Sequence, residues 1–204
     1  MERDRQSAVA THSSLEKLPN MSMRDDIAHV LLSEEKIHQR VSELGHQITH
    51  DYAGRDPLVL FVLKGALCFV ADLIRAIDIH VQLDFMVLSS YGSSTTSSGS
   101  VRIITDMRSD VRNRNVLIVE DIIDSGLTLQ EIIEHLRVRG PADIQVCTLL
   151  DKPARRRVAL DVRYIGFEIP DEFVVGYCLD FNERYRNLPF VGVLKPECYL
   201  PEQE

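Results

Sequence analysis

Residues 116–128 read Val-Leu-Ile-Val-Glu-Asp-Ile-Ile-Asp-Ser-Gly-Leu-Thr, and this stretch decides the fold. Its first four residues are all apolar, which is typical of a strand buried on both faces of a parallel sheet. Two carboxylates, Glu120 and Asp121, end the strand, and Asp124 follows three residues after Asp121. Ser125, a glycine and a threonine then lead into a helical pattern, so the stretch predicts a strand, a turn and a helix.

The residue types in this turn suit an anionic sugar. Open α/β sheets bind ligands at the carboxyl ends of their strands, and a helix N-terminus offers free N–H groups to a phosphate. Gly126 allows a close approach of the backbone, and Ser125 and Thr128 add hydroxyl donors. Carboxylates accept hydrogen bonds from sugar hydroxyls and take part in Mg²⁺ sites. The pattern therefore predicts a site for a phosphorylated sugar together with magnesium.

Two common nucleotide motifs do not fit the same stretch. It lacks the GxxxxGK[ST] pattern of a Walker loop, and no GxGxxG follows a strand as in dinucleotide-binding folds. A simpler alternative makes the three acids a solvated loop, with Ser125 only capping the helix. Three carboxylates between a buried strand and a helix start that suits phosphate disfavour that alternative.

Strands and helices alternate along the rest of the chain, which predicts an α/β fold with a largely parallel sheet. Residues 1–24 lack periodicity and are expected to form a loose tail before one domain over 25–204. The first helix is expected to begin at Ser33, and the helix at 127–139 to carry a capping box of Thr128 and Glu131. Further strands are expected at 58–63, 81–89, 101–105, 144–150 and 162–169, and a further helix at 66–76.

A polar tract interrupts this alternation at residues 92–100, which contain only Gly, Ser and Thr. Such a segment cannot bury apolar surface, so it forms either a dispensable surface loop or a lid over a site. The composition leaves both interpretations open.

Composition narrows the class of protein. The chain has 31 acidic and 23 basic residues and a formal net charge of −8, which argues against general nucleic-acid binding. We find no secretory signal and no apolar run near the ~20 residues that span a bilayer, so a cytoplasmic protein without membrane contact is expected. None of the four cysteines forms a CxxC pair, which favours free thiols over disulfides or a zinc site.

The stretch at 116–128 resembles the phosphoribosyl pyrophosphate signature of the type I phosphoribosyltransferases. Over about residues 30–199 the chain is most similar to the hypoxanthine(-guanine) phosphoribosyltransferases. Four further segments carry the resemblance in the family's order: Leu63-Lys64-Gly65, Ser90-Tyr91-Gly92, Leu150-Asp151-Lys152-Pro153, and residues 171–177 running on to Asp180 and Arg186.

The resemblance implies a fold and a reaction. The fold would be a largely parallel sheet flanked by helices, with a mobile lid at about 89–101 and a small C-terminal hood at about 162–204. The reaction would be purine salvage, in which a 5-phosphoribosyl group passes from phosphoribosyl pyrophosphate to N9 of hypoxanthine, and also guanine, to give IMP or GMP and pyrophosphate. Mg²⁺ would be the cofactor, and the assembly a homodimer or homotetramer.

Residue roles also follow from the resemblance. Asp124 would be the general base near N7 of the purine, and Ser90 and Tyr91 would belong to the lid. Glu120, Asp121 and Asp180 would surround magnesium. Purine contacts would come from Lys152, Phe173, Val174 and Asp180. Phosphoribosyl pyrophosphate would be bound by Lys64, Gly65, Glu120, Asp121, Asp124, Ser125, Gly126, Leu127, Thr128 and Arg186. In this family a non-proline cis peptide often occurs at residues corresponding to 63–65, and some relatives carry Lys where Leu127 stands.

Other interpretations stay open at this point. Lys152 beside Arg155–Arg157 is by itself typical of a solvated basic turn, and Phe173 by itself is typical of a core residue. Some proteins with this fold are regulators that bind nucleic acid, but the acidic composition and the presence of Asp124, Lys152 and Phe173 favour an enzyme. Lys152 with Phe173 favours a 6-oxopurine over xanthine or a pyrimidine, and the sequence does not choose between hypoxanthine and guanine.

Overall fold

A six-stranded sheet organises the computed structural model, which describes residues 22–90 and 101–200. Its strands lie in the order β4-β3-β2-β5-β6-β7, and only the β3–β4 pair is antiparallel. The predicted α/β class and largely parallel sheet are therefore confirmed. The bounds are β2 (Leu58–Leu63), β3 (Gln82–Ser90), β4 (Val101–Thr105), β5 (Asn115–Ile123), β6 (Asp143–Asp151) and β7 (Tyr164–Glu168).

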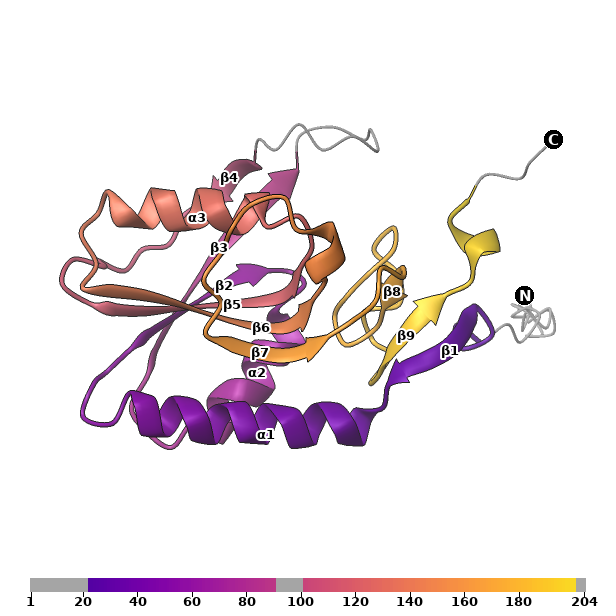
Figure 1. Ribbon diagram of the computed structural model, residues 1–204, viewed down its shortest axis with the longest axis horizontal. Coiled ribbons are helices and arrows are strands. Elements are labelled where there is room, and N and C mark those ends of the chain that lie inside the picture. Colours follow the sequence, from indigo (N-terminus) through magenta and orange to yellow (C-terminus); the bar gives the residue numbers. More distant parts are fainter. Residues whose placement is uncertain (1–21, 91–100, 201–204) are drawn as a thin grey trace, which may run out of the picture.

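Helices cover both faces of this sheet. Helices α1 (Glu34–Asp51) and α2 (Leu67–Ala76) lie on one face and α3 (Leu127–Arg137) lies on the other (Figure 1). Helix α1 begins where predicted, because the Ser33 side chain accepts a hydrogen bond from the Lys36 N–H at 3.4 Å. Glu34 and Glu35 in the first turn suit the positive end of the helix dipole.

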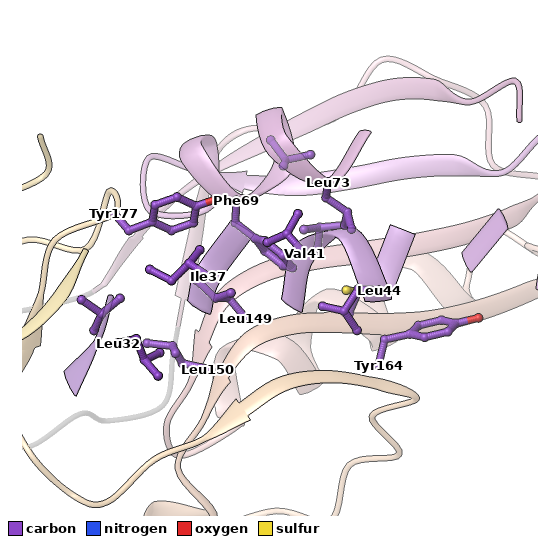
Figure 2. Packing of buried hydrophobic residues seen from close by; sticks show 14 of the residues in the cluster. Leu32, Ile37, Val41, Leu44, Phe69, Leu73, Leu149, Leu150, Tyr164 and Tyr177 are labelled. Atoms are coloured by element: carbon purple, nitrogen blue, oxygen red, sulfur yellow. The ribbon is translucent and has the colours of Figure 1, made fainter. Parts of the chain in front are cut away.

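Each face of the sheet has its own hydrophobic core. On the α1 and α2 face, alternate residues of β2, β5 and β6 pack against the helices (Figure 2). The side chains of this core that the figure labels are Leu32, Ile37, Val41, Leu44, Phe69, Leu73, Leu149, Leu150, Tyr164 and Tyr177. The intervening strand residues, such as Leu60 and Ile118, pack against α3. Burial on both faces explains the continuous apolar runs in these strands.

A second, smaller sheet lies beyond the carboxyl ends of the parallel strands (Figure 1). It consists of β1 (Ile27–Leu32), β9 (Val191–Leu194) and β8 (Val174–Val175), all antiparallel and in that order. The sequence did not predict β1, because its partner β9 lies more than 150 residues away along the chain. Strand β7, residues 164–168, pairs with β6 and therefore belongs to the large sheet. The small sheet instead takes its third strand, β1, from the N-terminal part of the chain.

Two details differ from the sequence-based expectation. The N-cap residue of α3 is Gly126, with φ of 83°, and not Thr128, so Thr128 does not cap the helix as the predicted capping box requires. Helix α3 also ends at Arg137, two residues earlier than predicted. The four cysteines are free, as expected. Within residues 22–90 and 101–200, no helix has the length and hydrophobicity that crossing a bilayer requires.

Close contact between α1 and α2 depends on Gly45. A Cβ added at Gly45 would lie 2.4 Å from Ala76 Cβ and 2.6 Å from the Ala76 carbonyl atoms. Backbone atoms cannot swing aside as a flexible side chain can. We therefore predict that Gly45→Val lowers the free energy of unfolding by about 2 kcal/mol in urea denaturation.

The control is His46→Val, which introduces the same residue at the exposed neighbouring position on the same helix. It should change the unfolding free energy by less than about 0.5 kcal/mol. Equal losses in the two variants would show that helix propensity, not the α1–α2 contact, sets the effect.

Candidate active site

Parallel pairing brings three turns to one edge of the large sheet. Strands β2 and β5 pair in register from Leu58 and Val116, and β5 pairs with β6 from Asn115 and Asp143. The turns that follow these strands begin at Lys64, Asp124 and Lys152, so residues far apart in sequence gather at the carboxyl edge. The Lys152 N–H donates to the Ile123 carbonyl at 3.0 Å and fixes the last two turns together.

The quoted stretch encloses a cavity at this edge. Its volume is about 240 Å³, and both the strand carboxylates and the helix start line it. The lining residues are Val62, Leu88, Glu120, Asp121, Ile122, Ile123, Asp124, Ser125, Gly126, Thr128 and Leu129. The structure therefore brings together the carboxylates and hydroxyls that the sequence marked as a sugar-phosphate site. Leu127 follows Gly126 as the first residue of α3.

Gly126 shapes the turn between β5 and α3. Its φ of 83° lies in the left-handed region, and an added Cβ would meet Leu160 Cδ1 at 2.8 Å. The turn is also tied on both sides: the Arg157 N–H donates to the Ser125 carbonyl at 2.9 Å, and the Leu127 N–H donates to Ser125 Oγ at 3.4 Å. These bonds hold the first turn of α3, whose leading N–H groups have no partner within the helix.

Glu120 and Asp121 are adjacent carboxylates, of which Glu120 is buried and Asp121 is partly buried. Burial raises the pKa of Glu120 well above its ordinary value, and the charge of Asp121 adds to the effect. Burial also raises the pKa of Asp121 to about 6, although backbone hydrogen bonds to its carboxylate lower that pKa in part. Gly65 makes the close packing possible, because an added Cβ would lie 1.8 Å from Asp121 Oδ2.

A charged network faces this pair from the other turns. Arg186 Nη2 lies 2.8 Å from Asp180 Oδ1 and 3.3 Å from Glu183 Oε1. Lys64 Nζ, which follows the cis peptide bond between Leu63 and Lys64, lies 2.8 Å from Glu183 Oε2. Arg186 Nε is buried without a hydrogen-bond partner, so this guanidinium has a donor left for an anion. The predicted cis peptide is present.

The carboxylates fit a magnesium ion in part. Within the described residues, no three His, Cys, Asp or Glu side chains cluster closely enough to hold a metal. The charge of Arg186 lowers the pKa of Asp121, and Asp180 is near enough for its charge to raise that pKa by a smaller amount. Mg²⁺ is usually held through one or two carboxylates together with substrate phosphates. The pair Asp121 and Asp180 fits that pattern.

A second cluster surrounds Lys152. Its Nζ donates to the Glu172 carbonyl at 2.7 Å and lies 3.9 Å from Asp171 Oδ1. Burial lowers the pKa of Lys152, while the charges of Asp124 and Asp171 oppose the shift. Phe173 follows on the same loop with 38% of its surface exposed, and Val174 is buried in β8. The sequence alone favoured a solvated turn and a core phenylalanine; the structure shows a buried lysine and an exposed ring.

Sequence reasoning missed the partner of Asp124. Arg155 Nε lies 3.0 Å from Asp124 Oδ1, and Arg155 Nη1 lies 3.6 Å from Asp171 Oδ2. Arg155 thus links the predicted base to the loop that carries Phe173. The 3-10 turn Pro153–Arg155 causes the link by folding the chain back after Lys152, and three consecutive arginines gave no sign that Arg155 would pair with Asp124.

The two predicted lid residues remain untested. Ser90 ends β3, where its backbone pairs with Val101, and Tyr91 lies outside the described residues. The polar tract at 92–100 also lies outside them.

The chain is similar to proteins of known type over most of its length. A family model described as a phosphoribosyl transferase domain matches residues 30–182. A hypoxanthine-guanine phosphoribosyltransferase of Bacillus subtilis is 54% identical over 177 residues, covering 87% of this chain and 98% of the relative. The crystal structure of a hypoxanthine phosphoribosyltransferase from Staphylococcus aureus has a TM-score of 0.86 and 48% identity, covering 90% of this chain and 100% of that one.

Longer relatives contain a similar segment. The bifunctional protein TilS/HprT of Listeria innocua is 52% identical over 180 residues, which cover 88% of this chain. This chain spans about 28% of that relative's length.

The raised pKa of Asp121 predicts how stability depends on pH. Well below pH 3.8 this carboxyl is protonated in both the folded and unfolded chain. As pH rises from its ordinary value of 3.8 to about 6, it ionises first in the unfolded chain, so folding stability is lost across that window. Asp121→Asn removes this loss. We expect the variant to unfold at a free energy about 1–3 kcal/mol higher at pH 7.5, with a difference below about 1 kcal/mol at pH 4.

Urea denaturation in a chelating buffer at several pH values measures this difference. Asp161→Asn, at an exposed position, is the control and should match the parent chain throughout. A stabilisation by Asp121→Asn that is equal at pH 4 and pH 7.5 would contradict the assignment.

Proposed function

This chain belongs to the phosphoribosyltransferase family, and we propose that it makes purine nucleotides by salvage. The reaction joins N9 of hypoxanthine, and also of guanine, to C1′ of phosphoribosyl pyrophosphate. The products are IMP or GMP and pyrophosphate. The observation that carries the proposal is the single cavity in which Glu120, Asp121 and Asp124 meet the N-terminus of α3. The relatives named hypoxanthine-guanine phosphoribosyltransferases support the choice of base.

The turn after β5 binds the ribose phosphate. The N–H groups at the start of α3 and the hydroxyls of Ser125 and Thr128 donate to the 5′-phosphate. Leu127 contributes its backbone here, since it has no charge to offer. Glu120 and Asp121 accept hydrogen bonds from the ribose hydroxyls. Burial raises the pKa of both carboxyls, and a bound sugar and cation would supply the hydrogen bonds and positive charge that favour their ionised forms.

Asp124 and Lys152 act on the purine from neighbouring turns. Asp124 accepts the N7 proton, which makes N9 more nucleophilic as the bond to C1′ forms. The Lys152 ammonium donates one hydrogen bond to the Glu172 carbonyl, so its other N–H groups can donate to the 6-oxo group. Phe173 stacks on the ring, and the backbone at Val174 and near Asp180 reads the edge of the base. Arg155 must release Asp124 when the purine enters.

Lys64, Gly65 and Arg186 bind the leaving pyrophosphate. The unpartnered Nε of Arg186 donates to its oxygens, and the ammonium of Lys64 does so in place of its contact with Glu183. Gly65 keeps the loop close to Asp121. Asp121 and Asp180, with Glu120 nearby, hold Mg²⁺, which supplies neutralisation of charge on the pyrophosphate. Ser90 and Tyr91 contribute to a lid that excludes water from the developing cation at C1′.

A product assay tests the proposal. The purified chain is incubated with phosphoribosyl pyrophosphate, Mg²⁺ and either hypoxanthine, guanine or xanthine, and nucleotide formation is followed spectrophotometrically. We expect IMP and GMP, and little product from xanthine. Absence of nucleotide with every base would contradict the proposal. Light scattering of the same sample measures whether the protein is the homodimer or homotetramer that we predict.

Asp124→Asn should separate catalysis from binding. The amide keeps the shape of the side chain but cannot accept the N7 proton. We expect kcat to fall about 100- to 10,000-fold while KM for both substrates changes little. Steady-state kinetics measure both constants, and Asp161→Asn is the matched exposed control. Unchanged turnover in Asp124→Asn would remove Asp124 from its role.

Lys152→Gln should act mainly on the base. Loss of a charged hydrogen bond to the 6-oxo group should raise KM for hypoxanthine about 10- to 100-fold. KM for phosphoribosyl pyrophosphate should stay within about twofold, because that substrate binds at the turn after β5. Arg157→Gln, which changes an exposed side chain in the same basic run, is the control. A rise in both KM values would indicate a distorted site and contradict a specific purine contact.

A further inference from the structure

Phe173 has an aromatic neighbour from the far end of the chain. The ring of Tyr199 stacks on it with a centroid distance of 4.8 Å and an interplanar angle of 20°. The sequence separation is 26 residues, and neither β8 nor β9 contains Tyr199. This contact has no role in the chemistry described above.

Phe181 completes a group of three rings. Its centroid lies 5.5 Å from Phe173 at an interplanar angle of 90°, and 6.5 Å from Tyr199. These distances place the directions from Phe173 to Tyr199 and to Phe181 close to a right angle. Tyr199 therefore stacks on one face of the Phe173 ring, and Phe181 packs perpendicular to it. Phe173 keeps 38% exposure, so part of its surface is accessible to a further contact.

Backbone contacts fix the position of Tyr199. The 3-10 turn Pro196–Cys198 follows β9, and the Tyr199 N–H donates to the Pro196 carbonyl at 3.1 Å. At the start of this segment, the Leu194 N–H donates to the Phe173 carbonyl at 2.9 Å. The segment that carries Tyr199 is thus joined to the Phe173 backbone through Leu194, while the Tyr199 ring packs beside the core of the small sheet.

We propose that Tyr199 is a positioning residue for the purine, acting through Phe173. This inference rests on the proposed function, in which the base stacks on Phe173. Lys152 holds the loop from one side through the Glu172 carbonyl, and Tyr199 holds the ring from the other side. A phenylalanine ring that is already fixed in one orientation does not have to be ordered when the base binds. The entropy cost of binding is therefore smaller and the affinity for the base is higher.

The effect should be specific to the base. Stacked aromatic pairs are worth enough that losing one should weaken a dependent contact about 3- to 10-fold. We expect Tyr199→Leu to raise KM for hypoxanthine and the dissociation constant for IMP by that factor. KM for phosphoribosyl pyrophosphate and kcat should stay within about twofold. Tyr199→Phe keeps the ring and should behave as the parent chain, because the structure gives the Tyr199 hydroxyl no role in the stack.

A double-mutant cycle makes the test sharp. If Tyr199 acts through the Phe173 ring, Tyr199→Leu should have little further effect on KM for hypoxanthine in a Phe173→Leu background. Leu200→Ala is the matched control, because Leu200 is exposed on the same C-terminal segment. It should leave all constants unchanged. Calorimetric titration with IMP provides a readout that is independent of turnover.

The outcomes distinguish this inference from the proposed function. An inactive parent chain would overturn the proposed function and this inference with it. An active parent in which Phe173→Leu weakens hypoxanthine but Tyr199→Leu does not would overturn this inference alone. Additive effects of the two leucine substitutions, or equal rises in KM for both substrates, would also overturn it. Should Tyr199→Leu not fold, Tyr199→Val, which also removes the ring, gives the same discrimination in the same cycle.

Discussion

The structure depends on where strand β5 ends. It lies between β2 and β6 in a parallel sheet, so its final residues are forced to the same edge as the turns after its neighbours. Glu120 and Asp121 are carried into a poorly hydrated position by a strand whose apolar residues anchor it on both faces. Burial of the strand stabilises the fold, while burial of its terminal carboxylates costs stability. A phosphorylated sugar and a cation would offset that cost.

Local sequence was enough for the large sheet and for one half of the site. Apolar runs such as 58–63 and 116–119 identify strands buried on both faces, and Ser33 identifies the start of α1. Residues 120–128 could be placed together because they are contiguous and straddle a strand end. The capping box failed at the same point because Gly126, in a left-handed conformation, took the N-cap position and left Thr128 inside the helix.

Contacts between distant segments could not be predicted in this way. Strand β1 reads as a short apolar stretch until β9 supplies its partner. Arg155 reached Asp124 through a 3-10 turn that the sequence does not distinguish from a solvated basic loop. Tyr199 stacks on Phe173 only because β8 and β9 pair. Residues 120–128 could be predicted from one contiguous motif. The contacts around Phe173 could not, because they form only when the small sheet assembles.

A crystal structure of the chain with IMP tests the central claim most directly. The account predicts the phosphate on the backbone N–H groups at Leu127 and Thr128 and the ribose hydroxyls against Glu120 and Asp121. The base should stack on the Phe173 ring, with Asp124 turned from Arg155 toward N7. A nucleotide bound elsewhere, or one that leaves Asp124 paired with Arg155 and directed away from the ring, would contradict it.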